Sequence, residues 1–260
     1  MGAQHGDLQG GWKPGPSLIS VGRGFLDLLL PPQALDGGAV GSPGLGAEAG
    51  GRITFIADPV CDGCGAPFDF DPGPGVACPA CSTKPRAFAR ARAACLYDEH
   101  SRNLILQLKH ADRTDLAPLM ARWLSRAAAD LLVEADAIAP VPLHPARLFA
   151  RRYNQAAEVA RPLARLADRP HLPDALVRRR ATATQGGKSG SGRRRNVAGA
   201  FAVPSGRCRQ VEGRRILLVD DVMTTGATLE ACAKALLAAG AVGVTAAVIA
   251  RVKEAPDVSM

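Results

Sequence analysis

The sequence predicts an α/β protein in which a mostly parallel sheet with flanking helices follows a small cysteine-rich module. Three observations predict this fold class. From Ala87 onward, short apolar segments alternate with segments of helical periodicity, as in parallel sheets covered by helices. Two Cys-x-x-Cys pairs precede that alternation. Near the C-terminus an apolar strand ends in two aspartates and leads through a threonine- and glycine-rich loop into a helix, which is typical of a ligand site at the carboxyl edge of such a sheet.

The N-terminal segment, residues 1–51, has few structure-forming signals. It contains 14 of the 28 glycines, and only 17–30 could form a short helix, so we expect a flexible segment. No run in the chain approaches the roughly 20 apolar residues of a membrane helix. The first residues also lack the charged and apolar regions of a signal peptide. We therefore expect a cytoplasmic protein with no membrane insertion.

The cysteine pairs lie in residues 52–86 and predict a metal site. Cys61 and Cys64 form one pair, and Cys78 and Cys81 form the other, with 13 residues between the pairs. Two facing pairs supply four thiolates for a tetrahedral structural zinc, although the separation is slightly below the usual ribbon spacing of about 15 to 20. A redox pair or a lost metal are the alternatives. A closed four-cysteine site has no open position, so we expect no catalysis there.

Residues 87–260 are predicted to form the α/β domain, and its elements follow in order. A strand and turn are expected at 89–100, and a second strand at 136–145 runs into a proline-rich loop. Helical periodicity is found at 101–113, 116–135, 146–167 and 227–240. Two strand-like arms at 176–185 and 193–203 surround a Gly/Ser/Lys tip. Buried strands are expected at 214–221 and 242–251.

Positive charge is concentrated in one part of the chain. The net charge is +8, and residues 145–215 hold 17 Lys and Arg against 4 Asp and Glu. Such a segment usually faces a polyanion, either a phosphorylated ligand or nucleic acid. Coding bias is the alternative, because 26 of the 32 basic residues are arginines, as a GC-rich gene would produce.

The segment from Asp220 to Thr228 carries the strongest site signal. Asp220 and Asp221 end an apolar strand, and Thr224, Thr225, Gly226, Ala227 and Thr228 form the loop before a helix. Backbone N–H groups of the loop and of the helix N-terminus favour a phosphate, and Gly226 permits close backbone approach. The carboxylates can accept hydrogen bonds from sugar hydroxyls. Together these features predict a cradle for ribose 5-phosphate.

Three other interpretations of this segment are weaker. A Walker A loop requires Gly-Lys-Ser/Thr, which is absent. A receiver domain also has adjacent acids, but the 39 residues after Asp221 leave no room for its later strands. An acidic helix cap explains one acid but not the run of threonines.

Several motifs of the chain, taken together, resemble those of a known family. LLVDDVMTTGATLEACAKALLAAGA is similar to the signature of type I phosphoribosyltransferases. With LILQLKHADRTDLAPL, APVPLHPARLFARRYNQAAEVARPLA, LVRRRATATQ, RRRNVAGAF, CDGCG and CPAC, the chain resembles the ComF family (competence protein F), which combines double zinc ribbons with phosphoribosyltransferase domains. The resemblance spans about residues 55–252. It implies a type I phosphoribosyltransferase-like sheet with flanking helices, preceded by a zinc ribbon.

One departure from the family concerns the N-terminus. Relatives often carry an earlier cysteine quartet after a Pro-Pro pair. Here Pro31-Pro32 is followed at the same spacing by Ala34, Gly37, Gly46 and Ala49, none of which is a ligand. The first ribbon is therefore interpreted as eroded; a simple glycine linker is the alternative.

The resemblance also implies roles for individual residues. Asp220 and Asp221 would be the catalytic pair that holds ribose hydroxyls, and the loop 224–228 would hold the 5-phosphate of phosphoribosyl pyrophosphate. Mg²⁺ would neutralise the pyrophosphate, chiefly through ligand phosphates and waters. Lys109, Arg151 and, in a mobile hood at 185–196, Arg194 are the candidate cations for pyrophosphate. A solvated helix face is the alternative for Lys109 and Arg151, and an exposed basic loop that contacts nucleic acid is the alternative for the hood. Tyr153, Asn154 and Gln155 match a family run whose role the sequence does not reveal.

Two classes of function remain open at the level of sequence. The first is an enzyme that transfers phosphoribose to an unidentified nitrogen acceptor, linked by family to DNA uptake and competence. The second is a non-catalytic zinc-ribbon accessory protein or nucleic-acid-binding protein in DNA uptake or processing, with DNA-uptake machinery or single-stranded DNA as partner. An aromatic content of 4% leaves few stacking platforms for single strands. A homo-oligomer is also compatible with the sequence.

Overall fold

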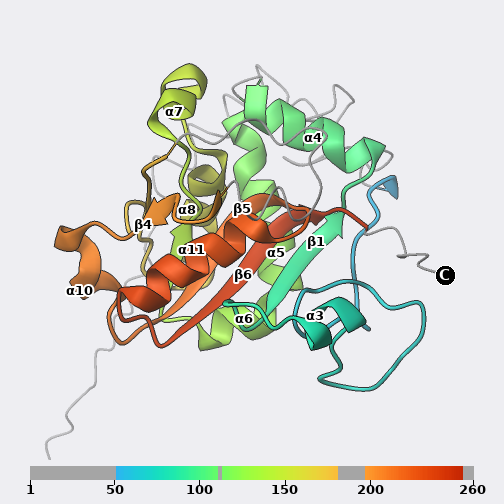
Figure 1. Ribbon diagram of the computed structural model, residues 1–260. Coiled ribbons are helices and arrows are strands. Elements are labelled where there is room, and N and C mark those ends of the chain that lie inside the picture. The colour runs from blue at the N-terminus through green and yellow to red at the C-terminus, as the bar shows by residue number, and fades with distance from the viewer. Residues whose placement is uncertain (1–50, 111–112, 181–196, 254–260) are drawn as a thin grey trace, which may run out of the picture. The chain divides into compact units, whose positions relative to one another are not determined.

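The structure is a computed structural model, which describes residues 51–110, 113–180 and 197–253 (Figure 1). Gly51–Met260 form one compact unit, separate from Met1–Gly50. The expected flexible segment, its eroded ribbon and the hood residue Arg194 lie outside the described residues. Among the helices of the described part, none is both long and apolar enough to cross a membrane.

A four-stranded parallel sheet forms the centre of this unit. Its order is β1 (Ala91–Leu96), β6 (Gly243–Arg251), β5 (Arg215–Met223) and β2 (Ala137–Pro140), and each neighbouring pair is parallel. A second sheet pairs the short strands β3 (Val177–Arg178) and β4 (Phe201–Ala202) in antiparallel fashion. The predicted mostly parallel sheet with flanking helices is therefore confirmed.

Helices cover both faces of the parallel sheet, so its central strands are buried throughout. Helix α11 (Ala227–Ala238) lies on one face, and α5 (Ala117–Ala127), α6 (Ala129–Glu134) and α8 (Gln155–Leu166) lie on the other (Figure 1). The run 216–219 of β5 is fully buried because alternate side chains enter the two opposite cores. The shorter helical elements are α3 (Pro79–Thr83), α4 (Glu99–His110), η1 (Thr114–Leu116), α7 (Pro145–Arg151), η2 (Ser205–Arg207) and α10 (Cys208–Val211).

The prediction of a continuous helix was wrong for two segments, because each segment is broken in the structure. The segment 116–135 is divided at Ala128, whose φ of −115° and ψ of 28° leave the helical region between α5 and α6. The segment 146–167 is divided after Arg151, because Arg152 adopts a left-handed φ of 65°. Asn154 then starts α8 by accepting a hydrogen bond from the N–H of Ala156. Strand β5 also continues past both aspartates to Met223.

The segment that leads into the cysteine pairs follows the free edge of β1. The N–H of Ile56 donates to the carbonyl of Ala94 at 3.0 Å, and the N–H of Leu96 donates to Thr54 at 2.9 Å. Further along, the N–H of Ala91 donates to Gly63 at 3.0 Å. These bonds cover the sheet edge with the cysteine-rich segment, so the two parts pack as one unit.

Candidate functional site

The two aspartates lie near the carboxyl end of β5 and meet a lysine from α4. Lys109 Nζ is 2.9 Å from Asp221 Oδ2, and both side chains are about four-fifths buried, with 18% and 19% exposed. Asp220 accepts a hydrogen bond from the backbone N–H of Asp221 at 2.9 Å. The structure thus brings together three of the side chains that the sequence analysis selected, from segments more than 100 residues apart.

Burial makes Asp220 an unusual carboxyl group. Desolvation, and then the neighbouring charge of Asp221, raise the pKa of Asp220 from 3.8 to about 7. The backbone N–H of Asp221, Lys109 and Arg178 oppose that shift. Near neutral pH the free protein therefore holds Asp220 between its protonated and ionised forms. A ligand that donates hydroxyl hydrogens favours the ionised form, because a carboxylate accepts hydrogen bonds through both oxygens.

The loop between β5 and α11 has the geometry of an anion cradle. Gly226 adopts a φ of 71° at the N-cap of α11, a conformation that glycine adopts readily. No side chain caps the helix, so its first N–H groups are available to a ligand. Residues 222–229 and Asp220 surround a hollow of about 20 Å³ at this loop. The hydroxyl of Thr225 is buried there with no hydrogen-bond partner among the described residues.

Arg86 contacts this loop, although the sequence analysis did not select it. Its Nη1 donates to the carbonyl of Thr225 at 2.6 Å. A Cβ on Gly226 would lie 2.9 Å from the same nitrogen, so glycine leaves the room that Arg86 occupies. Next to it, the N–H of Ala87 donates to Glu230 Oε2 at 2.7 Å, in the first turn of α11. No local pattern signals Arg86, since it is 139 residues from Thr225.

The run 153–155, unexplained by sequence, connects the elements around the site. The Tyr153 hydroxyl donates to the carbonyl of Leu108, the residue before Lys109. Asn154 Nδ2 donates to the carbonyl of Val141, just after β2, at 3.0 Å. Gln155 Oε1 accepts from Arg151 Nη1 at 3.3 Å. These three side chains tie α4, the exit of β2 and α7 to the start of α8.

Arg151, a predicted pyrophosphate ligand, ends α7 on the segment that follows β2. Strands β2 and β5 are parallel neighbours, so their carboxyl ends share one edge of the sheet. Figure 1 shows α4 and α7 on the same side of the sheet, where these carboxyl ends lie. The structure therefore places Lys109 and Arg151 at the edge that carries Asp220 and Asp221.

The four cysteines form a cluster with the dimensions of a metal site. Their Sγ atoms all lie within 4.8 Å of one another, and those of Cys64 and Cys78 are 3.8 Å apart. Zn–S bonds of about 2.3 Å in a tetrahedron place sulfurs about 3.8 Å apart. The N–H groups of Cys64 and Cys78 point at Cys61 Sγ, at 3.4 and 3.1 Å. The four cysteines Cys61, Cys64, Cys78 and Cys81 can therefore hold zinc.

The charged groups in and around the cysteine cluster also favour the binding of a metal ion. A hydrogen bond from the Cys64 thiol, together with backbone N–H groups, lowers the pKa of Cys61 to about 4. Arg251, only 2% exposed at the end of β6, donates from Nη1 to the carbonyl of Cys64 at 2.5 Å and approaches Cys64 Sγ at 3.3 Å. A buried guanidinium offsets one of the two excess negative charges that a four-thiolate zinc complex carries.

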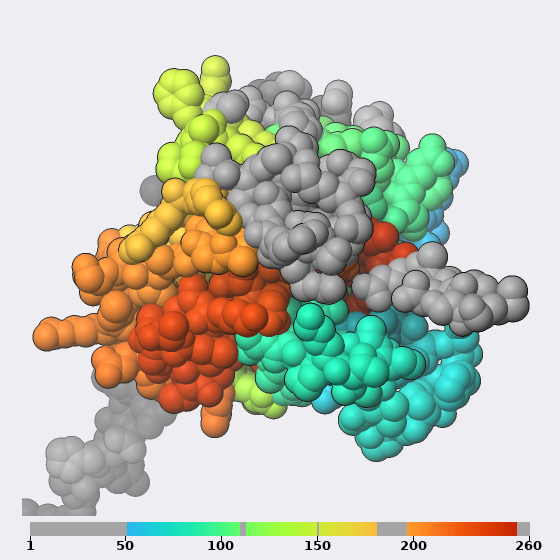
Figure 2. Space-filling view, viewed as in Figure 1, coloured from blue at the N-terminus to red at the C-terminus, as the bar shows by residue number. Residues whose placement is uncertain are grey.

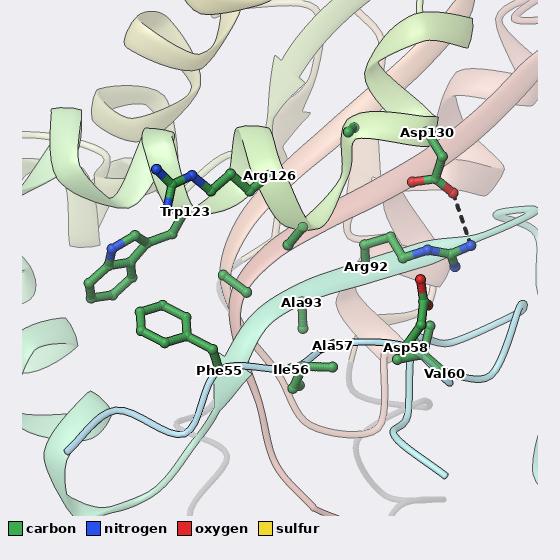
Figure 3. A pocket seen from close by; sticks show the side chains of 14 residues that line it. Phe55, Ile56, Ala57, Asp58, Val60, Arg92, Ala93, Trp123, Arg126 and Asp130 are labelled. Carbon is green, nitrogen blue, oxygen red and sulfur yellow. Dashed lines mark ion pairs between the residues drawn. The ribbon is translucent and has the colours of Figure 1, made fainter. Parts of the chain in front are cut away.

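A separate hollow of about 650 Å³ lies at the β1 edge, between residues 55–60 and helices α5 and α6 (Figure 3). The rings of Phe55 and Trp123 meet edge-on at one end, with centroids 5.1 Å apart. At the other end Arg92 pairs with Asp130 at 3.0 Å. Its lining includes neither the aspartate pair nor the loop 224–228, so it is distinct from the cradle.

Comparison with known proteins shows the family to which the chain belongs. The family described as Phosphoribosyl transferase domain matches residues 154–259. The DNA utilization protein YhgH of Escherichia coli K12 is 34% identical over 199 residues, covering 74% of this chain and 84% of that protein. Competence protein F of Haemophilus influenzae is 31% identical over 206 residues, covering 72% of this chain and 87% of that protein. The chain belongs to the ComF family.

Membership of the ComF family, the domain match and the parallel sheet together show a type I phosphoribosyltransferase-like fold. The matched region includes Asp220, Asp221 and the loop 224–228 but not Lys109, Arg86 or the four clustered cysteines. A solved glutamine phosphoribosylpyrophosphate amidotransferase from B. subtilis is also similar, at 20% identity and a TM-score of 0.38, over 55% of this chain and 30% of that one. This low similarity carries no part of the assignment.

Proposed function

We propose that this ComF-family protein binds phosphoribosyl pyrophosphate with Mg²⁺ at the Asp220–Thr228 segment and transfers phosphoribose to a nitrogen acceptor. The observation that carries the proposal is the β5–α11 connection. It presents two largely buried carboxylates and, a few residues later, a glycine-centred loop at an uncapped helix N-terminus. Vicinal hydroxyls and a phosphate are the groups that such a pair of subsites binds. The names of the relatives favour a role in DNA uptake or use, and we propose that the protein performs it in the cytoplasm.

The proposed reaction breaks the bond between C1 of the ribose and the pyrophosphate oxygen, whose electron pair leaves with pyrophosphate. The nitrogen acceptor supplies the electron pair of the new C1–N bond and then loses its proton to water. Asp220 and Asp221 would hold the ribose hydroxyls, and the loop N–H groups would hold the 5-phosphate. Lys109 and Arg151, with Arg194 in the hood, would stabilise the departing negative charge.

Mg²⁺ would supply further neutralisation of the pyrophosphate. Among the described residues, the cysteine cluster alone groups three or more side chains able to hold a metal ion. Mg²⁺ would therefore enter with the phosphates of the ligand, as is usual for this ion. The four cysteines are proposed to hold one structural zinc, with no open coordination position for chemistry.

Calorimetric titration with phosphoribosyl pyrophosphate and Mg²⁺ tests the proposal. Wild-type protein should bind, and Asp221→Asn should weaken binding by about tenfold or more, because it removes a charged acceptor worth about 1.5 to 3 kcal/mol. Asp115→Asn is the matched control, since Asp115 is an exposed acid that pairs with Arg113. Arg194→Ala should weaken phosphoribosyl pyrophosphate more than ribose 5-phosphate. Absence of wild-type binding to both ligands would overturn the proposal.

Single-stranded DNA binding is the second candidate function, and helix α7 favours it. Phe149 is 91% exposed there beside Leu148, and arginines at 147, 151 and 152 flank them. The α7 segment, yellow-green in Figure 2, protrudes from the surface. An exposed aromatic ring beside arginines suits base stacking with phosphate contacts. Fluorescence anisotropy with labelled oligonucleotide tests it: Phe149→Ala should weaken a salt-dependent interaction, and equal binding by the variant would exclude α7.

A further inference from the structure

We propose that Arg86 is a positioning residue that holds the loop 224–228 in its phosphate-binding shape, and that the four-cysteine site holds Arg86 in place. Zinc binding and phosphate binding are then thermodynamically coupled, each strengthening the other. This inference rests on the proposed function for the identity of the ligand, but the contacts that carry it exist without ligand.

The first link connects the cysteine cluster with Arg86. Cys81 lies on α3, whose first turn is closed by the N–H of Cys81 donating to the carbonyl of Cys78 at 2.9 Å. Arg86 follows Cys81 by five residues, and Pro85 between them restricts the backbone. A metal that fixes Cys78 and Cys81 therefore fixes the start of a short, restrained connection to Arg86.

The second link connects Arg86 with the loop and its helix. The guanidinium donates to the Thr225 carbonyl at 2.6 Å and lies 5.8 Å from the ring centre of the buried Phe88. The adjacent N–H of Ala87 donates to Glu230 at 2.7 Å. Because the carbonyl of Thr225 is engaged on this side, the peptide that joins Thr225 to Gly226 is held in one orientation. That peptide carries the N–H of Gly226, one of the backbone groups proposed to hold the phosphate.

Independent contacts keep the cysteine module on the domain. Arg251 bonds Cys64, and the next residue, Val252, donates its N–H to the carbonyl of Met223 at 2.9 Å, immediately before the loop. On the β1 side, Arg92 joins Asp62, which lies between Cys61 and Cys64, to Asp130 of α6, at 3.1 and 3.0 Å. Figure 3 shows the contact with Asp130. The module therefore has little freedom to move without moving Arg86.

Coupling of this kind is reciprocal. If zinc stabilises the loop shape that binds phosphate, a bound phosphate must raise the affinity for zinc by the same factor. Couplings between sites in proteins are typically about 5- to 150-fold, and we expect about tenfold here. We expect the effect for ligands that carry the 5-phosphate, because Arg86 hydrogen-bonds the loop 224–228, which is proposed to hold that group.

The first experiment compares Arg86→Gln with Lys84→Gln in zinc-loaded, full-length protein. Both substitutions remove one positive charge, but Lys84 is exposed, and it is Arg86 that hydrogen-bonds the loop. Arg86→Gln should raise amide hydrogen exchange across 223–229 without ligand and weaken ribose 5-phosphate and phosphoribosyl pyrophosphate by about tenfold. Inorganic pyrophosphate should bind as in the wild type. Lys84→Gln should change none of these quantities.

The second experiment measures zinc affinity by competition with a chromophoric chelator. Saturating ribose 5-phosphate should tighten zinc binding about tenfold in the wild type and in Lys84→Gln, but not in Arg86→Gln. Wild-type exchange across 223–229 in the Arg86→Gln variant would overturn the inference. So would an equal gain in zinc affinity in both variants.

The two proposals fail in different ways. If the wild type binds neither phosphorylated ligand, the proposed function fails, and hydrogen exchange of the loop in ligand-free Arg86→Gln still decides the positioning role. If the ligands bind but Arg86→Gln behaves like Lys84→Gln, the proposed function survives and the positioning role fails.

Discussion

Replacing Lys109 with methionine should destabilise the fold by an amount that depends on pH. The substitution keeps most of the side-chain volume and removes the ammonium 2.9 Å from Asp221 Oδ2. At an effective dielectric constant of 20 that contact is worth about 6 kcal/mol before desolvation is subtracted. Exposed pairs contribute about 0 to 1 kcal/mol, whereas breaking a buried pair costs about 3 to 5. With both side chains mostly buried, we expect a loss of about 1 to 3 kcal/mol at pH 8.

The pH dependence of this loss follows from Asp220. Lys109 opposes the rise in the pKa of Asp220, which is about 7 in the wild type. At pH 5.5 Asp220 is protonated in both proteins, so the missing ammonium costs less than at pH 8, where ionisation leaves the acid pair uncompensated. Urea unfolding at both pH values measures the difference.

The control for this prediction is Arg113→Met, which removes the cation of an exposed pair with Asp115, where the side chains are 35% and 50% exposed. It should cost less than about 1 kcal/mol at either pH. If Lys109→Met lowers the free energy of unfolding by no more than Arg113→Met does, or by the same amount at both pH values, the reasoning is refuted.

Three further predictions concern single features of the site. Because the pKa of Asp220 is raised from 3.8 to about 7, ligand-free protein should lose stability as pH rises between these two values, by at most about 4 kcal/mol. Asp220→Asn should flatten the dependence of the unfolding free energy on pH over the same range. Metal analysis should find one zinc per chain in the wild type and none after Cys61→Ser with Cys78→Ser. Gly226→Ala, at a φ of 71°, should weaken ribose 5-phosphate at least tenfold in calorimetry, whereas Gly206→Ala, with open space around it, should not.

Local patterns in the sequence were sufficient for the alternating order of strands and helices and for the segment proposed as the phosphate cradle. The alternation of apolar and helical segments predicts the parallel sheet, because side-chain periodicity reports directly on which faces are buried. The Asp220–Thr228 segment is recognisable since strand, acids, loop and helix start are contiguous. The cysteine pairs are recognisable for the same reason, as each pair is a local turn.

Helix interruptions were not predictable from the same patterns. Ala128 and Arg152 lie within runs whose periodicity continues on both sides, and their backbone conformations depend on how α5 and α8 pack against the sheet. Alanine and arginine are both good helix formers, so propensity gives no warning of either break. Tertiary packing outweighs that propensity at both positions.

The sequence by itself determined the fold class, the four cysteines that can hold a metal and the segment proposed as the phosphate cradle, because each depends on residues that are close together in the chain. Only the tertiary structure decided which distant side chains complete these sites. Lys109 meets Asp221, Arg86 meets Thr225, and Arg251 meets Cys64 across 187 residues. Such contacts depend on how sheet, helices and cysteine module pack in three dimensions, and no spacing along the chain encodes them.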